Sequence, residues 1–331
     1  MTRAGAGRAA ILVAGLALLG ACSGSQSALD PTGVEAGRVA TLSWVLFIGA
    51  AVIFVGVLVL TVAAVVGPAG FRTRLGREGV VIAGGIVFPV VILTILLGYG
   101  LTVMRAGGAE GDGEGASIAV VGEQWWWRVI YTDAEGRTFE SANEIRIPTG
   151  RPVKLALTTA DVIHSLWVPK LAGKLDMIPG RTNTLTLEAE EPGVSRGQCA
   201  EYCGGAHAFM AFHVVAMEPE DYDAWLDREA AVASRPGSTL EERGQLVFLS
   251  SGCGACHQVR GTDANGVIGP ELTHVGGRIA LAAGTLPNSR EAIADWIVAN
   301  QHIKPQNKMP PYAIFSDAEL DALSSYLASL E

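Results

Sequence analysis

The chain has 331 residues, of which 49% are hydrophobic and only 17% are charged, and its mean hydropathy is +0.33. Charged residues usually make up about a quarter of a globular chain, so this composition excludes a disordered or collagen-like protein and fits a wholly soluble enzyme poorly. The length predicts roughly two domains. The formal net charge of −9 argues against a nucleic-acid partner and allows a basic protein partner.

Residues 1–21 are expected to form a lipoprotein-type signal peptide. Arg3 and Arg8 precede an apolar run over residues 9–19, and small residues then lead to Cys22. A basic flank, a short apolar core and small residues are typical of an export signal, and this run is too short to span a bilayer. The sequence before Cys22 resembles a bacterial lipoprotein signal, which would make Cys22 the lipidated first residue. The alternatives are a first membrane helix and an ordinary signal with a chance cysteine.

Residues 39–105 are expected to form two transmembrane helices, at about 42–66 and 79–103, after an exported segment at 22–38. Neither helix contains a charged residue, and each is long enough to cross the hydrocarbon core of a bilayer. The loop between them contains three arginines, Arg72, Arg74 and Arg77. The positive-inside rule assigns such a loop to the cytoplasm. Both ends of the chain would then lie outside, as an exported N-terminus requires.

Residues 106–117 are rich in glycine and acidic residues and are expected to be a linker. Residues 118–217 then contain short runs of β-branched and aromatic residues separated by turn signals such as Pro179-Gly180. This pattern predicts one β-sandwich or barrel domain. The expected strands are 125–131, 144–147, 152–158, 182–187 and 212–217.

Residues 218–238 are expected to form a short helix and a second linker, and residues 239–331 a helical domain. Helices are expected over 241–249 and 290–300. The last helix begins with a capping box at Ser316 and Glu319. Leucines then recur on one face of this helix, which is typical of a helix that packs on a core.

A group of metal-binding side chains lies between residues 199 and 210. Cys199, Cys203, His207 and Met210 provide two thiols, an imidazole and a thioether, and soft ligands of this kind favour copper. Two bridging thiolates can hold two metal ions, each of which needs a further strong nitrogen ligand. His207 provides one, and His164 is the candidate for the other. The alternative is a Cys199–Cys203 disulfide with an incidental histidine and methionine.

A second group of residues, Cys253, Cys256 and His257, forms the C-x-x-C-H motif of covalent haem attachment, in which the histidine binds the iron. A zinc ribbon would need a second cysteine pair in the same domain, and residues 239–331 contain none. The iron needs a further axial ligand, and Met309, between Lys308 and two prolines, is the first candidate. The rival axial ligands are His274 and His302.

The segment from Cys199 to Met210, together with the segments 161–169 and 176–181, resembles subunit II of cytochrome c oxidase. The resemblance implies a cupredoxin-like β-sandwich and a dinuclear copper-A centre. Cys199 and Cys203 would bridge the two coppers, His164 and His207 would bind through ring nitrogens, and Met210 would bind through sulfur. The same resemblance implies that Glu201 binds copper through its carbonyl oxygen. The Glu201 side chain would reach a magnesium ion shared with subunit I.

The resemblance also implies a role for the first of three consecutive tryptophans, Trp125, as the point of electron entry. The alternative for these residues is strand packing together with an interfacial belt near the membrane. Residues 240–330 resemble a class I cytochrome c. This second resemblance implies covalent haem c on Cys253 and Cys256, with His257 and Met309 as axial ligands. It also implies a crossing of the first and last helices near Gly244 and Tyr326.

The expected protein is thus a multidomain membrane protein with a two-helix transmembrane hairpin, a cupredoxin-like β-sandwich and an all-α cytochrome c domain. The resemblance implies the electron-entry subunit of a bacterial haem–copper oxidase in the plasma membrane, with both soluble domains on the outer face. Its partners would be subunit I, which reduces dioxygen and pumps protons, subunit III, and reduced cytochrome c or a cytochrome bc complex as donor. The alternatives are a copper-A subunit of nitric oxide reductase and a non-enzymatic copper carrier. A quinol oxidase subunit II would lack the copper ligands.

Overall fold

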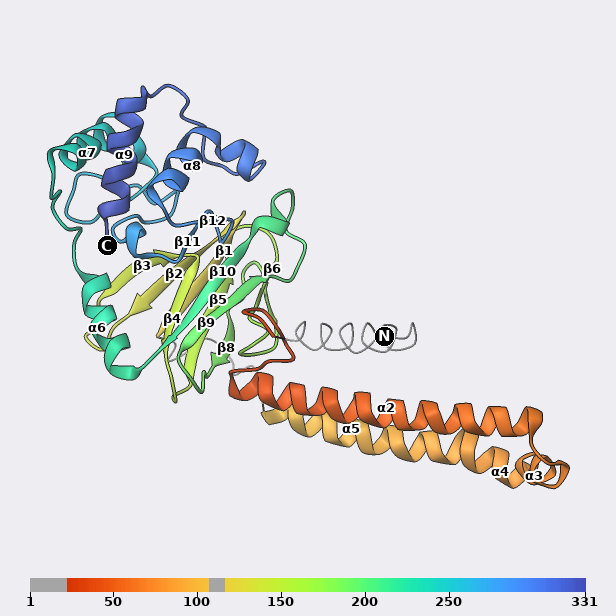
Figure 1. Cartoon of the computed structure of the whole chain (residues 1–331). Coiled ribbons are helices and arrows are strands. Elements are labelled where there is room, and N and C mark those ends of the chain that lie inside the picture. Colours follow the sequence, from red (N-terminus) through yellow and green to blue (C-terminus); the bar gives the residue numbers. More distant parts are fainter. Residues whose placement is uncertain (1–22, 107–116) are drawn as a thin grey trace, which may run out of the picture. The chain divides into compact units, whose positions relative to one another are not determined.

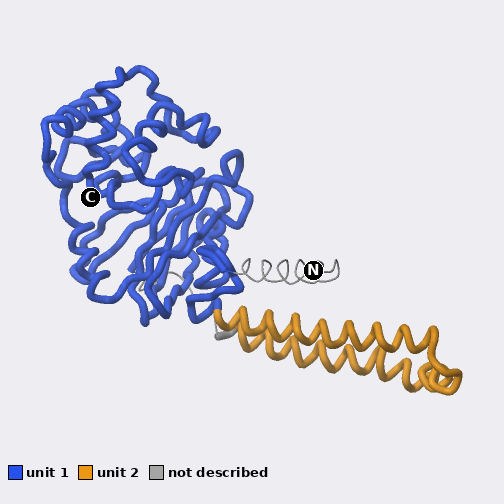
Figure 2. Tube along the Cα trace, in the orientation of Figure 1, with its two compact units in different colours: residues 1–36, 109–331 blue, residues 37–108 orange. Residues whose placement is uncertain are grey.

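The computed structural model describes residues 23–106 and 117–331. The predicted signal peptide, Cys22 and most of the predicted linker at 106–117 lie outside the described residues. The chain divides into two compact units, one formed by residues 37–108 and the other by residues 1–36 and 109–331 (Figure 2). The first contains the apolar helices, and the second contains the strands and the C-terminal helices.

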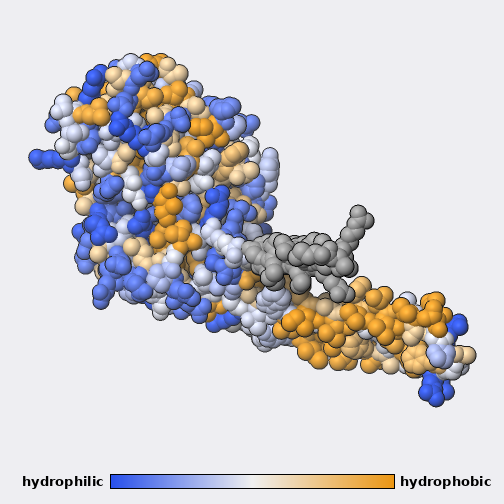
Figure 3. Space-filling view, viewed as in Figure 1, coloured by the Kyte–Doolittle hydropathy of each residue, from blue (hydrophilic) through white to orange (hydrophobic). Residues whose placement is uncertain are grey.

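The 37–108 unit contains helices that are long and apolar enough to cross a membrane. Helix α2 (Val34–Val66), which begins in the other unit, and the helical span Glu78–Met104 each contain an 18-residue stretch that is strongly apolar, with mean hydropathies of 3.0 and 2.9. Apolar residues cover the surface of these helices (Figure 3). The second span is built from α4 (Glu78–Ile82), the π-helical turn η2 (Ala83–Val87) and α5 (Phe88–Ala106). The π-helical turn ends just before Pro89, whose missing N–H favours an irregular helix at this point.

Helix α3 (Ala69–Leu75) connects the two apolar spans and carries Arg72 and Arg74. Arg77 follows as the residue before α4. The three arginines predicted to lie in the loop are therefore all at the same end of the helical pair. The assignment of this end to the cytoplasm stays a prediction.

The strands form a sandwich of two five-stranded sheets (Figure 1). Within each sheet most neighbouring strands are antiparallel, but β1 pairs with β5 and β10 with β4 in parallel. The first sheet has the order β3 (Thr138–Ala142), β2 (Trp126–Thr132), β1 (Ile118–Glu123), β5 (Val153–Thr159), β8 (Asn183–Leu187). The second has the order β4 (Glu144–Pro148), β10 (Ala211–Met217), β9 (Gly193–Cys199), β6 (His164–Trp167), β7 (Leu175–Met177).

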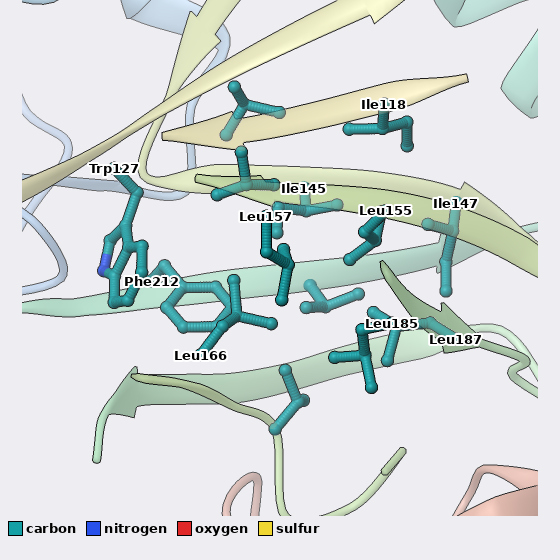
Figure 4. Packing of buried hydrophobic residues seen from close by; sticks show 14 of the residues in the cluster. Ile118, Trp127, Ile145, Ile147, Leu155, Leu157, Leu166, Leu185, Leu187 and Phe212 are labelled. Carbon is teal, nitrogen blue, oxygen red and sulfur yellow. The ribbon is translucent and has the colours of Figure 1, made fainter. Parts of the chain in front are cut away.

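The core of the sandwich lies between the two sheets (Figure 4). Burial alternates along β1 and β2, as expected when one face of a strand packs on a core. Trp127 and Phe212 meet edge to face with their ring centroids 5.1 Å apart. A side chain at Gly197 would collide with the Phe212 ring, so close packing requires glycine there. This core packing holds the start of β6, the end of β9 and the start of β10. The predicted copper ligands His164, Cys199 and Met210 lie at or next to these strand ends.

The expected β-sandwich is confirmed, and each of the five strands expected from the sequence corresponds to an observed strand within a residue or two. The five other strands, β1, β3, β6, β7 and β9, were not predicted. Strand β9 contains two glycines, Gly193 and Gly197, which are depleted in strands, and only one β-branched residue, Val194. Its pairing with β10 and β6 therefore decides its conformation.

Helix α6 (Pro219–Ala230) covers one edge of the sandwich. Trp225 is buried there and meets Tyr131 edge to face at 5.0 Å. The predicted helix at this point is thus present, and its aromatic residues extend the sandwich core.

The C-terminal domain is helical, as expected. It contains α7 (Thr239–Ser250), α8 (Arg290–Ile303) and α9 (Asp317–Ser329), with short turns and the two-stranded β11–β12 ribbon (Ala280–Leu281 and Leu286–Pro287) between them. The predicted capping box at Ser316 and Glu319 is confirmed. The crossing of α7 and α9 is confirmed as well, because a Cβ at Gly244 would lie 2.6 Å from Cβ of Tyr326.

Candidate copper and haem sites

The end of β9, the following loop and the start of β10 bring the predicted copper ligands together. Cys199 Sγ lies 3.8 Å from Cys203 Sγ. Cys203 Sγ lies 3.4 Å from Nδ1 of His207 and 3.7 Å from Sδ of Met210. The carbonyl oxygen of Glu201 lies 3.2 Å from Cys199 Sγ. Both thiols are buried and free. The structure therefore does not contain the Cys199–Cys203 disulfide that was the alternative.

His164 reaches this cluster from the first residue of β6. Its Nδ1 lies 3.8 Å from Cys199 Sγ, and its Nε2 lies 2.8 Å from Oδ1 of Asp161. The carboxylate accepts the Nε2 proton, which leaves Nδ1 free to bind a metal, a common arrangement for histidine ligands. The ring packs against Gly122, where a Cβ would lie 2.7 Å from the imidazole. The strand β1 therefore needs glycine at this position.

The protonation of the cluster follows from these contacts. The hydrogen bond between the two thiols lowers the pKa of Cys199 to about 4 and raises the pKa of Cys203. Burial lowers the pKa of His164, but the hydrogen bonds to Cys199 and Asp161 outweigh burial and leave this pKa above its usual value. Metal binding needs thiolates and a neutral imidazole, so the binding of copper would release protons.

The donor chemistry of the cluster fits copper. Two thiols, two imidazole nitrogens, a thioether and a carbonyl oxygen surround one small volume, and the ligand atoms of His164, Cys199 and Cys203 all lie within 4.8 Å of one another. Thiolate, thioether and imidazole together suit copper. All the donors come from the protein, so a metal bound by the whole set would lack the open position of a catalytic metal site. The arrangement suits electron transfer rather than substrate binding.

The three consecutive tryptophans have three different surroundings. Trp127 is in the sandwich core, and Trp126 lies under the Arg128 guanidinium, which is 4.9 Å from its ring. Trp125, only 9% exposed, donates from Nε1 to the carbonyl oxygen of Cys203 at 3.1 Å. Gln124 Nε2 donates to the same oxygen at 2.8 Å. The first tryptophan is thus in direct contact with a predicted copper ligand, and its role in electron entry stays a prediction.

The haem candidates line a cavity of about 420 Å³, which is within the range of cofactor pockets. Cys253, Cys256, His257 and Met309 all line it, with apolar side chains that include Ile297 and Leu323. His274 and His302 are not among its lining residues; His274 instead lies 3.1 Å from the carbonyl oxygen of Ala231. Among the described residues, Met309 is therefore the better candidate for the second axial ligand.

The His257 ring is held by its own chain. Its Nδ1 donates to the carbonyl oxygen of Pro270 at 2.7 Å, which leaves Nε2 with a free lone pair. A Cβ at Gly269 would lie 2.5 Å from Cε1 of the ring. The loop after the motif can therefore approach the imidazole this closely only because residue 269 is glycine. Burial lowers the pKa of His257, and the neutral form that results is the one that binds iron.

The Met309 loop is positioned by amide side chains at the end of α8. Gln301 Nε2 donates to the carbonyl oxygen of Met309 at 3.0 Å, and Asn300 Nδ2 donates to that of Pro310 at 3.1 Å. The backbone N–H of Met309 donates to Oδ1 of Asn307 at 2.9 Å. These bonds hold an otherwise irregular loop at the wall of the cavity.

Arg278 is a further residue of the haem site that the sequence reasoning missed. It is buried, lines the cavity and donates from Nη2 to the carbonyl oxygen of Glu271 at 2.6 Å, while its Nε has no hydrogen-bond partner among the described residues. An orphaned buried guanidinium N–H fits a cavity that receives an anionic group. The carboxylates of a haem supply such a group.

The soluble part of the chain is similar to two known protein families. A family model described as cytochrome c oxidase subunit II, periplasmic domain, matches residues 134–217, and a cytochrome c model matches residues 241–331. Cytochrome c oxidase subunit 2 of Bacillus subtilis is 31% identical over 256 residues, which cover 74% of this chain and 70% of that protein. The corresponding protein of Bacillus sp. strain PS3 is 30% identical, over 74% of this chain and 72% of that protein. The chain belongs to the cytochrome c oxidase subunit II family.

Cytochrome c oxidase subunit 2 of Alkalihalophilus pseudofirmus is 42% identical over 214 residues, and the match covers 65% of this chain and 61% of that protein's length. Among solved structures, the periplasmic domain of subunit II of cytochrome oxidase of Bradyrhizobium japonicum matches with 31% identity and a TM-score of 0.33, over 35% of this chain and 93% of that domain. Membership of the family with an added cytochrome c domain implies a copper-A centre and haem c.

Proposed function

We propose that this chain is the electron-entry subunit of a haem–copper terminal oxidase, in which electrons pass from an outside donor through haem c and copper-A to subunit I. The observation that carries the proposal is the position of Trp125. Its indole bonds to the carbonyl of Cys203 in the soft-ligand cluster, and the same residue lines the cavity of the haem candidates. One residue thus adjoins both candidate redox sites.

The copper-A centre would be held by the six donors of the cluster: His164, Cys199, the carbonyl of Glu201, Cys203, His207 and Met210. Haem c would be attached to Cys253 and Cys256, with His257 and Met309 as axial ligands. When bound, these groups would supply one-electron transfer, in which the haem iron loses one electron and the copper pair gains it, with no bond made and no proton moved. The chain's own residues exclude water and hold the ligands in place, which favours small geometry changes on electron transfer.

Trp125 is proposed as the point at which electrons enter the copper centre. Its ring is buried, and its hydrogen bond to Cys203 makes a direct contact between the ring and a ligand residue.

The side chain of Glu201 is proposed as a ligand of a magnesium ion that is shared with subunit I. It is half-buried, so it can face a partner subunit.

The proposed partners are subunit I, where dioxygen would be reduced to water with proton pumping, and subunit III. The donor to haem c would be reduced cytochrome c or a cytochrome bc complex. The apolar spans anchor the chain in a membrane, and we propose a bacterial plasma membrane with both soluble domains on the outer face and with lipidation at Cys22. A copper carrier would need exposed, exchangeable ligands, whereas Cys199, Cys203 and Met210 are buried.

The test is metal and haem analysis of the full chain purified in detergent, after copper has been offered to the reduced protein, together with a redox-difference optical spectrum. We expect two coppers for each covalent haem and a near-infrared band that disappears on reduction. Haem without copper would overturn the copper-A assignment. Copurification with a subunit that reduces nitric oxide instead of dioxygen would overturn the assignment to a terminal oxidase. The proposed role in electron entry would still stand.

A further inference from the structure

Lys304, the residue after α8, has an unusual environment. It is 2% exposed, and lysine is almost never buried so fully without a paired charge. No ion pair joins it to a carboxylate among the described residues. Its Nζ donates to the carbonyl oxygens of Trp125 at 2.6 Å and Ala282 at 3.2 Å. Burial lowers the pKa of Lys304 to about 7. The Lys304 side chain, which is costly to bury, therefore bonds to Trp125 of the sandwich and to Ala282 of the C-terminal domain.

Trp125 is consequently held from both sides. Its Nε1 donates a hydrogen bond to the carbonyl oxygen of Cys203 in the loop at residues 200–210, which we call the copper ligand loop. Its own carbonyl oxygen accepts the hydrogen bond from Lys304. Lys304 also lines the haem cavity, as Trp125 does. This is a continuous series of contacts from a copper ligand, through one tryptophan, to the wall of the haem cavity.

The turn at residues 282–283 supports the same contact. Ala282 and Ala283 have φ angles of 53° and 60°, in the left-handed region that is unfavourable for alanine. Such conformations persist where the surrounding structure holds them. Here the carbonyl of Ala282 accepts the Lys304 bond, and that of Ala283 accepts the N–H of Ala211 from β10 at 3.1 Å. The strained turn thus presents adjacent carbonyls to Lys304 and to the strand beside Met210.

We propose that Lys304 is a positioning residue that holds the wall of the haem cavity against Trp125 and the copper ligand loop. The inference about docking rests on these contacts alone; its consequence for electron transfer rests on the proposed function. Arginines of the sandwich make the complementary bonds, because Arg128 and Arg196 donate to the carbonyls of Val267 and Gly284 at 2.8 and 3.1 Å. Lys304 differs from them in that it bonds to the residue that also contacts Cys203.

The test compares Lys304→Leu with Lys174→Leu in the full chain loaded with haem and copper. The Lys174 side chain is exposed on the sandwich, forms no ion pair among the described residues and does not line the haem cavity, so it is the matched control. The readout is hydrogen–deuterium exchange at two backbone N–H groups that bond between the sandwich and the C-terminal domain. Ala211 donates to the carbonyl oxygen of Ala283, and Ile279 donates to the Glu144 carboxylate at 2.7 Å. We expect about tenfold faster exchange in Lys304→Leu, the effect of losing the one hydrogen bond that Nζ makes to the sandwich, and unchanged exchange in the control.

Equal exchange in Lys304→Leu and the unaltered chain would overturn the positioning role. If Lys304→Leu does not fold, Lys304→Gln decides by the same criterion, because the shorter amide has poorer reach to the Trp125 carbonyl. A second readout is the rate at which haem c, rapidly reduced, is reoxidised by copper, which we expect to fall in Lys304→Leu. If the unaltered chain shows no such transfer, the proposed function fails, while the exchange result still decides the docking role.

Discussion

Nε1 of Trp125 donates a hydrogen bond to the carbonyl oxygen of Cys203 at 3.1 Å. This bond joins the first residue of the tryptophan triplet to a proposed bridging ligand of copper-A, over 78 positions in the sequence. Neighbouring Gln124 donates to the same oxygen and, from its backbone N–H, to Asp161, which holds His164. The loop between β1 and β2 therefore supports the copper ligands from two directions.

The first prediction concerns this bond. Trp125→Phe keeps an aromatic ring and removes the N–H donor, so we expect reoxidation of haem c by copper to slow about tenfold, which corresponds to about 1.4 kcal/mol in the barrier. The stability should fall by only about 1 kcal/mol, as for one neutral hydrogen bond. The measurement is the rate after rapid haem reduction. Trp126→Phe is the control, since its ring packs on Arg128 and makes no bond to Cys203; an equal slowing in both variants would contradict the role of Trp125.

The second prediction concerns the partner of His164. Asp161→Asn removes the carboxylate that accepts the Nε2 proton, so the ring is less well oriented and is a weaker base. We expect copper affinity to fall about 10- to 100-fold, the usual effect of losing such a partner. Titration of the reduced full chain with copper in a competing chelator measures it. Asp223→Asn removes an exposed carboxylate far along the chain and should leave the affinity unchanged; an unchanged affinity in Asp161→Asn would show that the carboxylate does not tune the site.

The third prediction concerns Met309. Met309→Leu keeps an apolar side chain at the cavity wall and removes the thioether, so covalent haem should be retained while the reduction potential of haem c falls, because methionine ligation raises the potential. Redox titration followed by optical spectroscopy measures both. Met217→Leu, at the end of β10, is the control. An unchanged potential in Met309→Leu would exclude Met309 as the axial ligand.

The fourth prediction concerns pH. Burial raises the pKa of Glu271 above its usual value despite Arg260 and Arg278 nearby. A carboxyl whose pKa is higher in the folded than in the unfolded chain stabilises the fold below the unfolded pKa, and this contribution is lost as pH rises through the folded pKa. The unfolding temperature should therefore fall as pH rises from about 4.5 through the raised pKa, and Glu271→Gln should flatten this part of the profile.

Thermal unfolding of the full chain at a series of pH values measures the effect. The exposed Glu191→Gln is the control and should follow the unaltered chain. A Glu271→Gln profile that keeps the same slope would mean that Glu271 does not titrate differently in the folded protein.

Much of the candidate chemistry could be predicted from the sequence because it lies in short segments. The donors from Cys199 to Met210 fall within one loop, and Cys253, Cys256 and His257 fall within one turn, so chain connectivity alone keeps them close. The two long apolar helical spans and the capping box at Ser316 are also local features, and the structure contains them. His164 lies 35 positions before Cys199, and it was expected because the copper pair needs a second nitrogen ligand and because the family resemblance implies it.

Only the tertiary structure decided which distant residues support these sites. Strand β9 has little strand propensity, and pairing with β10 and β6 makes it the strand that ends at Cys199. Arg278 and Lys304 resemble ordinary surface residues in the sequence, and only the structure shows that both are buried beside the haem cavity. Lys304 meets Trp125 across 179 positions. The sequence by itself determined the chemistry of the ligands, whereas the packing of two domains determined what holds those ligands in place, because hydrogen bonds between distant segments exist only once the chain has folded.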